Sequence, residues 1–478
     1  MFCNPSSILR AGLLLAAALP HALGRAINEP GVLSEPRDAH EPRAIPPSVD
    51  PFYQPPDGFE SKEPGDVLRS RRIIAGFFGL IPDPIEAYQV LYRTTAIDGS
   101  PIATVTTIFK PLFAKRDRFV AFNTAYDSSS IDCSPSYAYQ LGSFSTDAVA
   151  SLEFLVIQAY LASGYVVASS DYEGPDAAFS PGYLSGMGVL DGMRAVKNFG
   201  RKLGLSKDPM VVGTGYSGGG LATGWAAALQ PSYAPELQMK GWVAGGIPAN
   251  LTDILLYIDR TVTSGFEPIA VAGLLKPSAY GAQLQPVVDG IITEEGRKAI
   301  QFANDQCVVA NLLAFPFQSI LDTKFQSLGP ELLYEPTVAG ILGNNTLGIN
   351  KDLTPTAPVM QYHATPDEIV PYGPADTLRQ SWCDFGATVK FTNFAAGGHL
   401  TTVVLAIVDA LTFTNDAFAG KVSPECSSKT VLDEKLNPIA LGVSLEPILI
   451  GLINWLGVLG TKDENFLNGI KNGKPVSA

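Results

Sequence analysis

The sequence predicts an α/β protein in which helices flank a mainly parallel sheet and a large helical segment is inserted between two strands. Short apolar runs typical of buried strands alternate along the chain with helical patterns. Roughly a hundred residues with mainly helical apolar spacing then separate two of these runs. The chain has 478 residues, of which 46% are hydrophobic and 17% charged, so it has enough apolar side chains for a core of this kind.

The predicted elements follow one another in α/β order. Residues 88–95 and 104–109 alternate in polarity like an opening hairpin. One predicted helix ends at Ala162, and another covers residues 191–203. The strands predicted after the hairpin cover residues 119–122, 165–169, 210–212, 241–246, 357–362 and 389–392. Strands separated by helices pair in parallel, so we expect their carboxyl ends to meet at one edge of the sheet.

The pentapeptide Gly215-Tyr216-Ser217-Gly218-Gly219 lies between the apolar run 210–212 and a helical stretch rich in Gly and Ala. This context predicts a strand, a sharp turn that presents the serine hydroxyl, and a helix whose N-terminus points at the reacting atoms. Small residues suit such a turn, because a side chain would collide with neighbouring backbone. A Gly-rich turn of another α/β protein, or a phosphate-binding loop, has a similar sequence. Ser217 is therefore a candidate nucleophile that needs partners.

Two histidines are candidates for the general base. The chain has four, and His21 and His40 fall in an N-terminal segment that we expect to be removed or disordered. His399 follows the strand-like run 389–392, as expected for a base on a loop beyond the last strand. In an α/β-hydrolase the triad runs serine, acid, histidine along the chain, and His399 satisfies that order. His363 precedes the candidate acid and is better interpreted as a hydrogen-bonded structural residue at a strand end.

The acid of the triad should follow the strand before that loop. Residues 357–362 form this predicted strand, Asp367 follows them, and Glu368 is the second candidate. All three groups are needed because a serine hydroxyl is a poor nucleophile: an imidazole must accept its proton, and a carboxylate must hold the imidazole. An Asx turn would explain Asp367 alone, and a loop histidine would explain His399 alone. Their order, each after a predicted strand, favours a serine hydrolase.

The N-terminus and the charge indicate a secreted, extracellular protein. Arg10 precedes the apolar run 11–19 and small residues follow, so residues 1–24 are predicted to be a cleaved signal peptide. Residues 25–49 are rich in Pro, Glu and Arg, which predicts a disordered segment or a pro-segment. The net charge of −13 argues against nucleic acid or an anionic membrane as a partner. The apolar run 448–459 is too short to span a bilayer, so we expect no transmembrane anchor.

The rest of the chain divides into a core and an insertion. Residues 50–247 and 353–478 are predicted to form the two parts of one hydrolase core. Residues 248–352 are predicted to form a helical cap, or lid, over the active site. A separate domain with an unrelated function is the alternative for the insertion.

The cysteines predict two disulfides. Cys3 would leave with the signal peptide, and an even number remains for an oxidising compartment, with three possible pairings. Neither Cys-x-x-Cys nor His-x-x-x-His spacing occurs in the sequence, so disulfides are favoured over a metal site and no metal is expected. Two sequons would make Asn250 and Asn344 glycosylation acceptors if exposed. The remaining cysteines are Cys133, Cys307, Cys383 and Cys426.

Several short motifs together resemble one family. They are Asp50-Pro51-Phe52-Tyr53, Tyr126-Asp127-Ser128, Cys133-Ser134-Pro135-Ser136-Tyr137, the Ser217 pentapeptide, Gly245-Gly246-Ile247-Pro248-Ala249-Asn250, Pro366-Asp367-Glu368-Ile369-Val370-Pro371 and Gly397-Gly398-His399. In this combination the chain resembles the fungal secretory lipases of the lipase A type, a branch of the α/β-hydrolases. The resemblance extends over nearly all of the mature chain.

The resemblance implies an esterase or lipase that cleaves acylglycerols without a cofactor, with Ser217 as nucleophile, Asp367 as orienting acid and His399 as base. It also implies an oxyanion hole formed by Gly218 and Asp127. The backbone N–H of Gly218, at the start of a helix, suits this role. A carboxylate repels an oxyanion, so Asp127 must act protonated or through its own N–H; an Asx-type turn is its alternative role.

The family pattern has further implications. The disulfides would join Cys133 to Cys307 and Cys383 to Cys426. A C-terminal flap within residues 353–478 would help to gate an acyl tunnel. Contact with a lipid surface would be transient, and we expect the protein to act as a monomer.

Three functions remain open at the level of sequence. The first is hydrolysis of lipid esters through an acyl-enzyme. The second is esterase, acyl-transfer or peptidase activity on other substrates with the same triad, because water and other acceptors share the acyl-enzyme. The third is a non-catalytic lipid-binding protein on the hydrolase scaffold, which the presence of all three triad residues disfavours.

Overall fold

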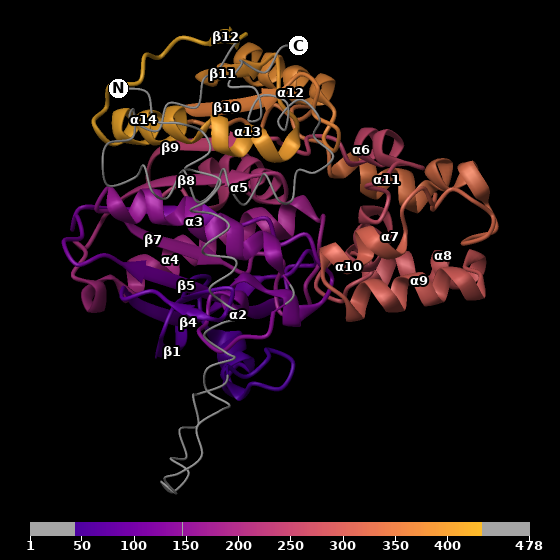
Figure 1. The fold of residues 1–478 in the computed structure, drawn as a ribbon, viewed down its shortest axis with the longest axis horizontal. Coiled ribbons are helices and arrows are strands. Elements are labelled where there is room, and N and C mark those ends of the chain that lie inside the picture. The colour runs from indigo at the N-terminus through magenta and orange to yellow at the C-terminus, as the bar shows by residue number, and fades with distance from the viewer. Residues whose placement is uncertain (1–43, 146, 433–478) are drawn as a thin grey trace, which may run out of the picture. The chain divides into compact units, whose positions relative to one another are not determined.

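The computed structural model describes residues 44–145 and 147–432 (Figure 1). The predicted signal peptide 1–24, most of segment 25–49 and the apolar run 448–459 lie outside the described residues. Residues 44–49, the end of the segment predicted to be disordered or a pro-segment, are among the described residues. The N–H of Ala44 donates to the carbonyl of Gly142 at 3.2 Å, and the hydroxyl of Ser48 donates to Asp132 at 2.8 Å. These contacts join residues 44 and 48 to residues 142 and 132 of the predicted core.

One sheet of ten strands runs through the described part of the chain, in the order β1-β4-β5-β7-β6-β8-β9-β10-β11-β12. The strands from β7 onward in this order pair in parallel, whereas β1, β4, β5 and β7 pair antiparallel with one another. A short hairpin, β2 (Gly76–Phe77) and β3 (Ile81–Pro82), stands apart. The strands of the sheet are β1 (Val67–Ile73), β4 (Glu86–Thr95), β5 (Pro101–Lys110), β6 (Arg118–Asn123), β7 (Val166–Ser170), β8 (Met210–Tyr216), β9 (Gln238–Gly245), β10 (Val359–Ala364), β11 (Val389–Phe394) and β12 (Ser427–Val431).

Helices cover both faces of this sheet. One core cluster packs the sheet against α4 (Gly182–Leu203), α5 (Gly218–Tyr233) and α12 (Tyr372–Asp384), with Trp225 and Trp382 buried in it. A second cluster packs the other face against α3 (Ala148–Ala162), α13 (His399–Leu405) and α14 (Ile407–Phe418). Short elements precede α3: η1 (Pro51–Tyr53), η2 (Phe59–Ser61), η3 (Ile131–Cys133) and α2 (Pro135–Ala138). The predicted fold class is thus the observed architecture, a mainly parallel sheet between two helical layers.

The chain leaves the sheet after β9 and returns at β10, and it is helical between them. Figure 1 shows these helices grouped at one side of the sheet. They are α6 (Leu251–Ile258), α7 (Phe266–Leu274), α8 (Gly281–Ile291), α9 (Glu294–Asp305), α10 (Val308–Ala314), η4 (Gly329–Tyr334) and α11 (Pro336–Asn344). We call residues 248–352 the cap segment.

No single helix in residues 44–432 is both long and apolar enough to cross a membrane. The pair formed by α13 and α14 meets the length and composition together, with a bend of 49° between its two helices.

Candidate active site

The Ser217 turn has the geometry that its sequence predicts. Ser217 lies between β8 and α5 with φ 56° and ψ −122°, a conformation that few residues other than glycine adopt. Its N–H donates to the carbonyl of Gly245 on β9 at 3.0 Å. A Cβ on Gly215 would lie 2.2 Å from the carbonyl oxygen of Gly219, and one on Gly219 would lie 1.8 Å from that of Asn123. The turn therefore requires glycine at both positions.

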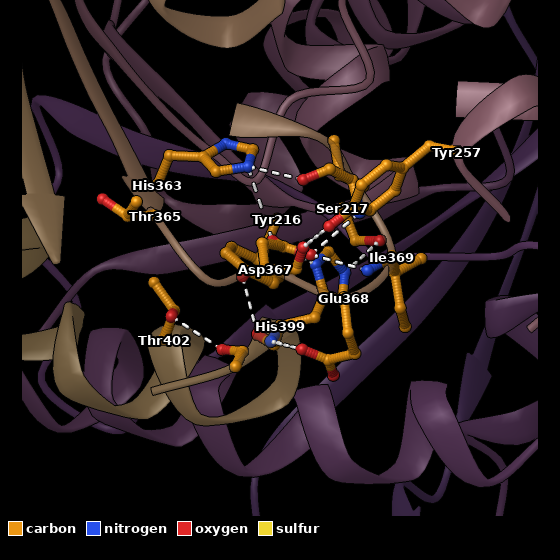
Figure 2. A network of polar contacts seen from close by, with 12 residues as sticks. Tyr216, Ser217, Tyr257, His363, Thr365, Asp367, Glu368, Ile369, His399 and Thr402 are labelled. Carbon is orange, nitrogen blue, oxygen red and sulfur yellow. Dashed lines mark hydrogen bonds and ion pairs between the residues drawn. The ribbon is translucent and has the colours of Figure 1, made fainter. Parts of the chain in front are cut away.

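Ser217, Asp367 and His399 converge at the carboxyl ends of the parallel strands (Figure 2). His399 Nε2 lies 2.8 Å from Ser217 Oγ, and His399 Nδ1 lies 2.7 Å from Asp367 Oδ2. The other carboxylate oxygen of Asp367 accepts the N–H groups of Ile369 and Val370, at 2.9 and 2.8 Å. Three side chains, each located beyond the end of a different strand, thus form one line of hydrogen bonds that ends at the serine hydroxyl.

The two weaker candidates of the sequence analysis lie next to this line. Glu368 Oε2 accepts the backbone N–H of His399 at 2.8 Å, and no hydrogen bond joins it to the imidazole. His363 is fully buried; its Nε2 lies 2.9 Å from the carbonyl of Val370 and 3.5 Å from Asp367 Oδ2. Both histidines thus approach the same oxygen of Asp367, and Asp367 is the carboxylate that contacts the imidazole of His399.

Burial and charge act in opposite directions on the two ionisable partners. Burial alone would lower the pKa of His399, but the charge and hydrogen bond of Asp367, with help from Glu368 and Asp127, raise it above its ordinary value. Burial alone would raise the pKa of Asp367, but His399 and His363 hold it below the ordinary value. The pair therefore favours an ionised Asp367 that stabilises positive charge on His399.

Asp127 lies directly against the start of α5. A Cβ on Gly218 would lie 1.9 Å from Asp127 Oδ1, so the carboxyl group packs on the backbone of Gly218. Asp127 is buried, has φ 48°, and its Oδ1 accepts no hydrogen bond from the described residues. Burial raises the pKa of Asp127 to about 6, against the opposing charge of His399. Its carboxyl group is thus protonated more readily than an exposed aspartate.

Two tyrosines contribute contacts that the sequence analysis did not identify. Tyr216 donates its hydroxyl to the backbone carbonyl of His399 at 2.6 Å, and its ring packs on the imidazole with centroids 4.9 Å apart. Tyr257, on α6 of the cap segment, donates its hydroxyl to the backbone carbonyl of Asp367 at 2.7 Å. Tyr216 is adjacent to the nucleophile in sequence, whereas no sequence signal connects Tyr257 to a residue 110 positions away.

An apolar pocket opens beside Ser217. It is lined by Ser217, Gly218 and Asp127 together with apolar residues of α6 and α7. A second cavity lies within the cap segment. The two spaces share a wall, formed by Leu255, Glu267, Val271, Leu274, Ile320 and Leu342. The hydroxyl of Ser217 therefore lies at the edge of a pocket with mainly apolar walls.

The remaining predicted site residues are not among those that line this pocket. The structure pairs Cys133 with Cys307 and Cys383 with Cys426, the pairing that the resemblance implied. Asn344 is exposed at the end of α11, whereas Asn250 caps α6 and accepts the N–H of Thr252 at 3.0 Å. Among residues 44–432, no group of three or more His, Cys, Asp and Glu side chains is arranged to hold a metal ion.

Comparison with known proteins identifies the family. Residues 139–425 match the model of the family described as secretory lipase. A secreted triacylglycerol lipase of Malassezia restricta is 40% identical over 383 residues, which cover 78% of this chain and 80% of that protein. A secreted triacylglycerol lipase of Malassezia globosa is 38% identical over 434 residues, covering 90% and 94%. The chain belongs to the secretory lipase family.

A solved structure agrees with this assignment. Candida antarctica lipase A in its closed state superposes with a TM-score of 0.77 at 31% identity, covering 85% of this chain and 95% of that one. The family and the α/β-hydrolase fold predicted from the sequence are confirmed, and with them the assignment of the chain to secreted lipases.

Proposed function

We propose that the protein hydrolyses the ester bonds of acylglycerols, triacylglycerols included, through an acyl-enzyme on Ser217. His399 accepts the proton of the serine hydroxyl as it attacks the ester carbonyl, and later donates it to the departing alcohol. Asp367 holds the imidazole and stabilises its charged form. Water then attacks the acyl-enzyme, with His399 again as the base, and releases the fatty acid.

The oxyanion hole in this proposal is formed by Gly218 and Asp127. The N–H of Gly218, at the first turn of α5, faces the developing negative charge. Asp127 contacts the same backbone and donates through its own N–H or, below the pKa of about 6, through its protonated carboxyl group. The mechanism uses only side chains and backbone groups of the chain itself.

The cap segment supplies the acyl site in this proposal. The pocket beside Ser217 and the cavity behind it are lined mainly by aliphatic side chains, which suits the hydrocarbon chain of a lipid ester. The names of the relatives, secreted triacylglycerol lipases, support this substrate class over a peptide or a small polar ester. We propose transient contact with a lipid surface as the route by which such an insoluble substrate enters.

The observation that carries the proposal is the line of hydrogen bonds from Asp367 through His399 to Ser217, at 2.7 and 2.8 Å, beside an apolar pocket. The test is the change Ser217→Ala, assayed by titration of the fatty acid released from an emulsified triacylglycerol. We expect kcat to fall by at least about 10⁴-fold, as loss of a nucleophile does in serine hydrolases. Ser232→Ala, near the other end of α5, is the matched control and should keep normal turnover. A Ser217→Ala protein with normal turnover would refute the proposal.

A further inference from the structure

Two adjacent carboxylates contact the same histidine by different atoms. Asp367 Oδ2 lies 2.7 Å from His399 Nδ1 in the imidazole ring. Glu368 Oε2 accepts the backbone N–H of His399 at 2.8 Å. In Figure 2 a dashed line marks the contact between Glu368 and the backbone of His399. The loop after β10 therefore holds both the ring and the backbone of His399.

The backbone N–H of His399 needs a partner from elsewhere in the fold. His399 is the first residue of α13, and the first N–H groups of a helix have no intrahelical acceptor. The residue before it, Gly398, has no side chain that could cap the helix. Glu368 supplies the missing acceptor from a loop 31 residues away. A charged acceptor makes a hydrogen bond roughly twice as strong as a neutral one.

The peptide groups of His399 are held from two sides. Glu368 accepts its N–H, and the hydroxyl of Tyr216 donates to its carbonyl oxygen at 2.6 Å. With the backbone fixed in this way and Nδ1 bonded to Asp367, the ring has one orientation, in which Nε2 lies 2.8 Å from Ser217 Oγ. Proton transfer depends on this distance, so the contact of Glu368 with the backbone bears on the reacting atoms.

We propose that Glu368 is a positioning residue for the general base, which holds the backbone of His399 while Asp367 holds its imidazole. The inference rests on the proposed function, because it assumes that His399 accepts the serine proton. The two adjacent carboxylates thus have different roles. Asp367 orients the imidazole ring, and Glu368 holds the first residue of α13.

The charge of Glu368 gives this role a second signature. The charged groups that face His399 are Asp367, Glu368 and Asp127, each of which raises the pKa of the imidazole. His363, whose own pKa is lowered by burial, contacts Asp367. Removing the charge of Glu368 therefore lowers the pKa of His399. The base functions when neutral, so the acid side of the pH profile should move to lower pH.

The experiment compares Glu368→Gln and Glu368→Ala in the full chain. The readouts are kcat and KM for p-nitrophenyl butyrate from pH 5 to pH 9. Alanine removes both the acceptor and the charge, so we expect kcat to fall about tenfold with KM within about twofold, since misplaced catalytic groups lower turnover rather than binding. Glutamine keeps an acceptor oxygen, so it should restore most of that loss while its acid limb moves to lower pH, as it does in the alanine variant.

Controls separate this inference from a general loss of structure. Glu60→Ala, an exposed glutamate in η2, should match the wild type in kcat and in pH profile. Equal losses of kcat in both Glu368 variants, together with a lowered melting temperature, would make Glu368 merely structural and overturn the inference. Wild-type kcat and an unshifted profile in Glu368→Ala would overturn it as well.

A parallel His399→Ala variant separates the proposed role of Glu368 from the proposed hydrolase function. If His399→Ala is inactive and Glu368→Ala behaves like the wild type, the inference fails and the proposed function stands. If His399→Ala keeps full turnover, the proposed function itself is wrong.

Discussion

The strand ends around Ser217 and the cap segment beside them are built in different ways. At the strand ends, backbone groups and buried polar side chains fix each position, and the contacts from Ser217 to Asp367 and Ile369 are hydrogen bonds of 2.7 to 2.9 Å. In the cap segment, mainly aliphatic side chains surround two neighbouring spaces that share a wall. Hydrogen bonds therefore fix the side chains at the strand ends, whereas apolar packing determines the shape of the spaces in the cap segment.

This difference indicates which region determines the reaction and which determines the substrate. Hydrogen bonds place a serine and an imidazole within the narrow limits that proton transfer requires. A cavity lined by aliphatic residues discriminates between substrates by volume, and one methylene changes the binding free energy by only about 1 to 3 kcal/mol. Changes at the strand ends should therefore affect all substrates strongly, and changes in the cap segment should affect some substrates moderately.

Among changes that leave the three triad side chains in place, the largest expected effect follows from adding a side chain at Gly219. A Cβ in Gly219→Ala would lie 1.8 Å from the carbonyl oxygen of Asn123, a backbone atom that cannot move without distorting β6. We expect kcat to fall at least about a hundredfold on every ester, with destabilisation of about 1 to 3 kcal/mol from overpacking. Turnover of acetate and oleate esters, together with urea unfolding, measures both effects.

The matched control for this change is Gly340→Ala in α11 of the cap segment. A Cβ there has no atom within 4 Å, and alanine favours a helix over glycine by roughly 1 kcal/mol. Unchanged turnover and equal or greater stability are expected. If Gly219→Ala retained wild-type turnover, the turn at Ser217 would tolerate the added methyl group. The strand ends would then not be more sensitive to substitution than the cap segment.

A moderate, substrate-dependent effect is expected from Val271→Phe. Val271 lines both the pocket beside Ser217 and the cavity behind it, so a larger side chain at this position reduces the space available to an acyl chain. We expect kcat/KM for an oleate ester to fall about tenfold while that for an acetate ester stays within about twofold. A series of p-nitrophenyl esters from acetate to oleate measures the ratio.

Val262→Phe makes the same replacement at a residue of the cap segment that is 39% exposed. It should leave the ratio of long-chain to short-chain activity unchanged. Equal losses on acetate and oleate in Val271→Phe would mean damage to the triad rather than a narrowed acyl site. No loss on oleate would show that the acyl chain takes another path.

The contrast also explains what the sequence could predict. Ser217, Asp367 and His399 each follow a predicted strand, and parallel strands bring their carboxyl ends to one edge, so chain order alone brought the three together. Asp367 and Glu368 are adjacent in sequence, and only the structure shows that one contacts the imidazole and the other the backbone of His399. Tyr257 was missed because its contact with Asp367 depends on how the cap segment packs.

Parts of the fold escaped prediction for equally physical reasons. Helix α4 begins at Gly182, nine residues before the predicted start at Asp191, in a stretch rich in glycine, a residue that disfavours helices. Packing requires glycine there, because a Cβ on Gly182 would lie 2.0 Å from Trp225 Nε1. Strand β12 (Ser427–Val431) is mostly exposed and polar, so no apolar alternation marks it. In both places tertiary contacts, rather than local pattern, select the structure.

The smallest expected effect concerns a carboxyl group between the two spaces of the cap segment. Burial, followed by the neighbouring Asp259, raises the pKa of Glu267 to about 8, against the hydrogen bond from the N–H of Ile320 and the charge of Arg260. A folded-state pKa above the unfolded value of about 4.3 means that this group stabilises the fold fully below pH 4. That contribution is lost as the pH rises through about 8. Glu267→Gln, which cannot ionise, should therefore lose less stability than the wild type between pH 5 and pH 9.

Melting temperatures at pH 5, 7 and 9 measure this difference, which we expect to amount to a few degrees in favour of Glu267→Gln at pH 9 relative to pH 5. Glu236→Gln is the control, because the pKa of Glu236 is shifted in the opposite direction to that of Glu267. The hydrogen bond from Arg194 holds it below its ordinary value. The stability that Glu236 contributes is present above pH 5 and does not change up to pH 9. If the difference between wild type and Glu267→Gln were the same at pH 5 and pH 9, Glu267 would be ionised in the fold at both. The cap segment would then hold a buried charge between the two spaces, and its interior could not be described as purely apolar.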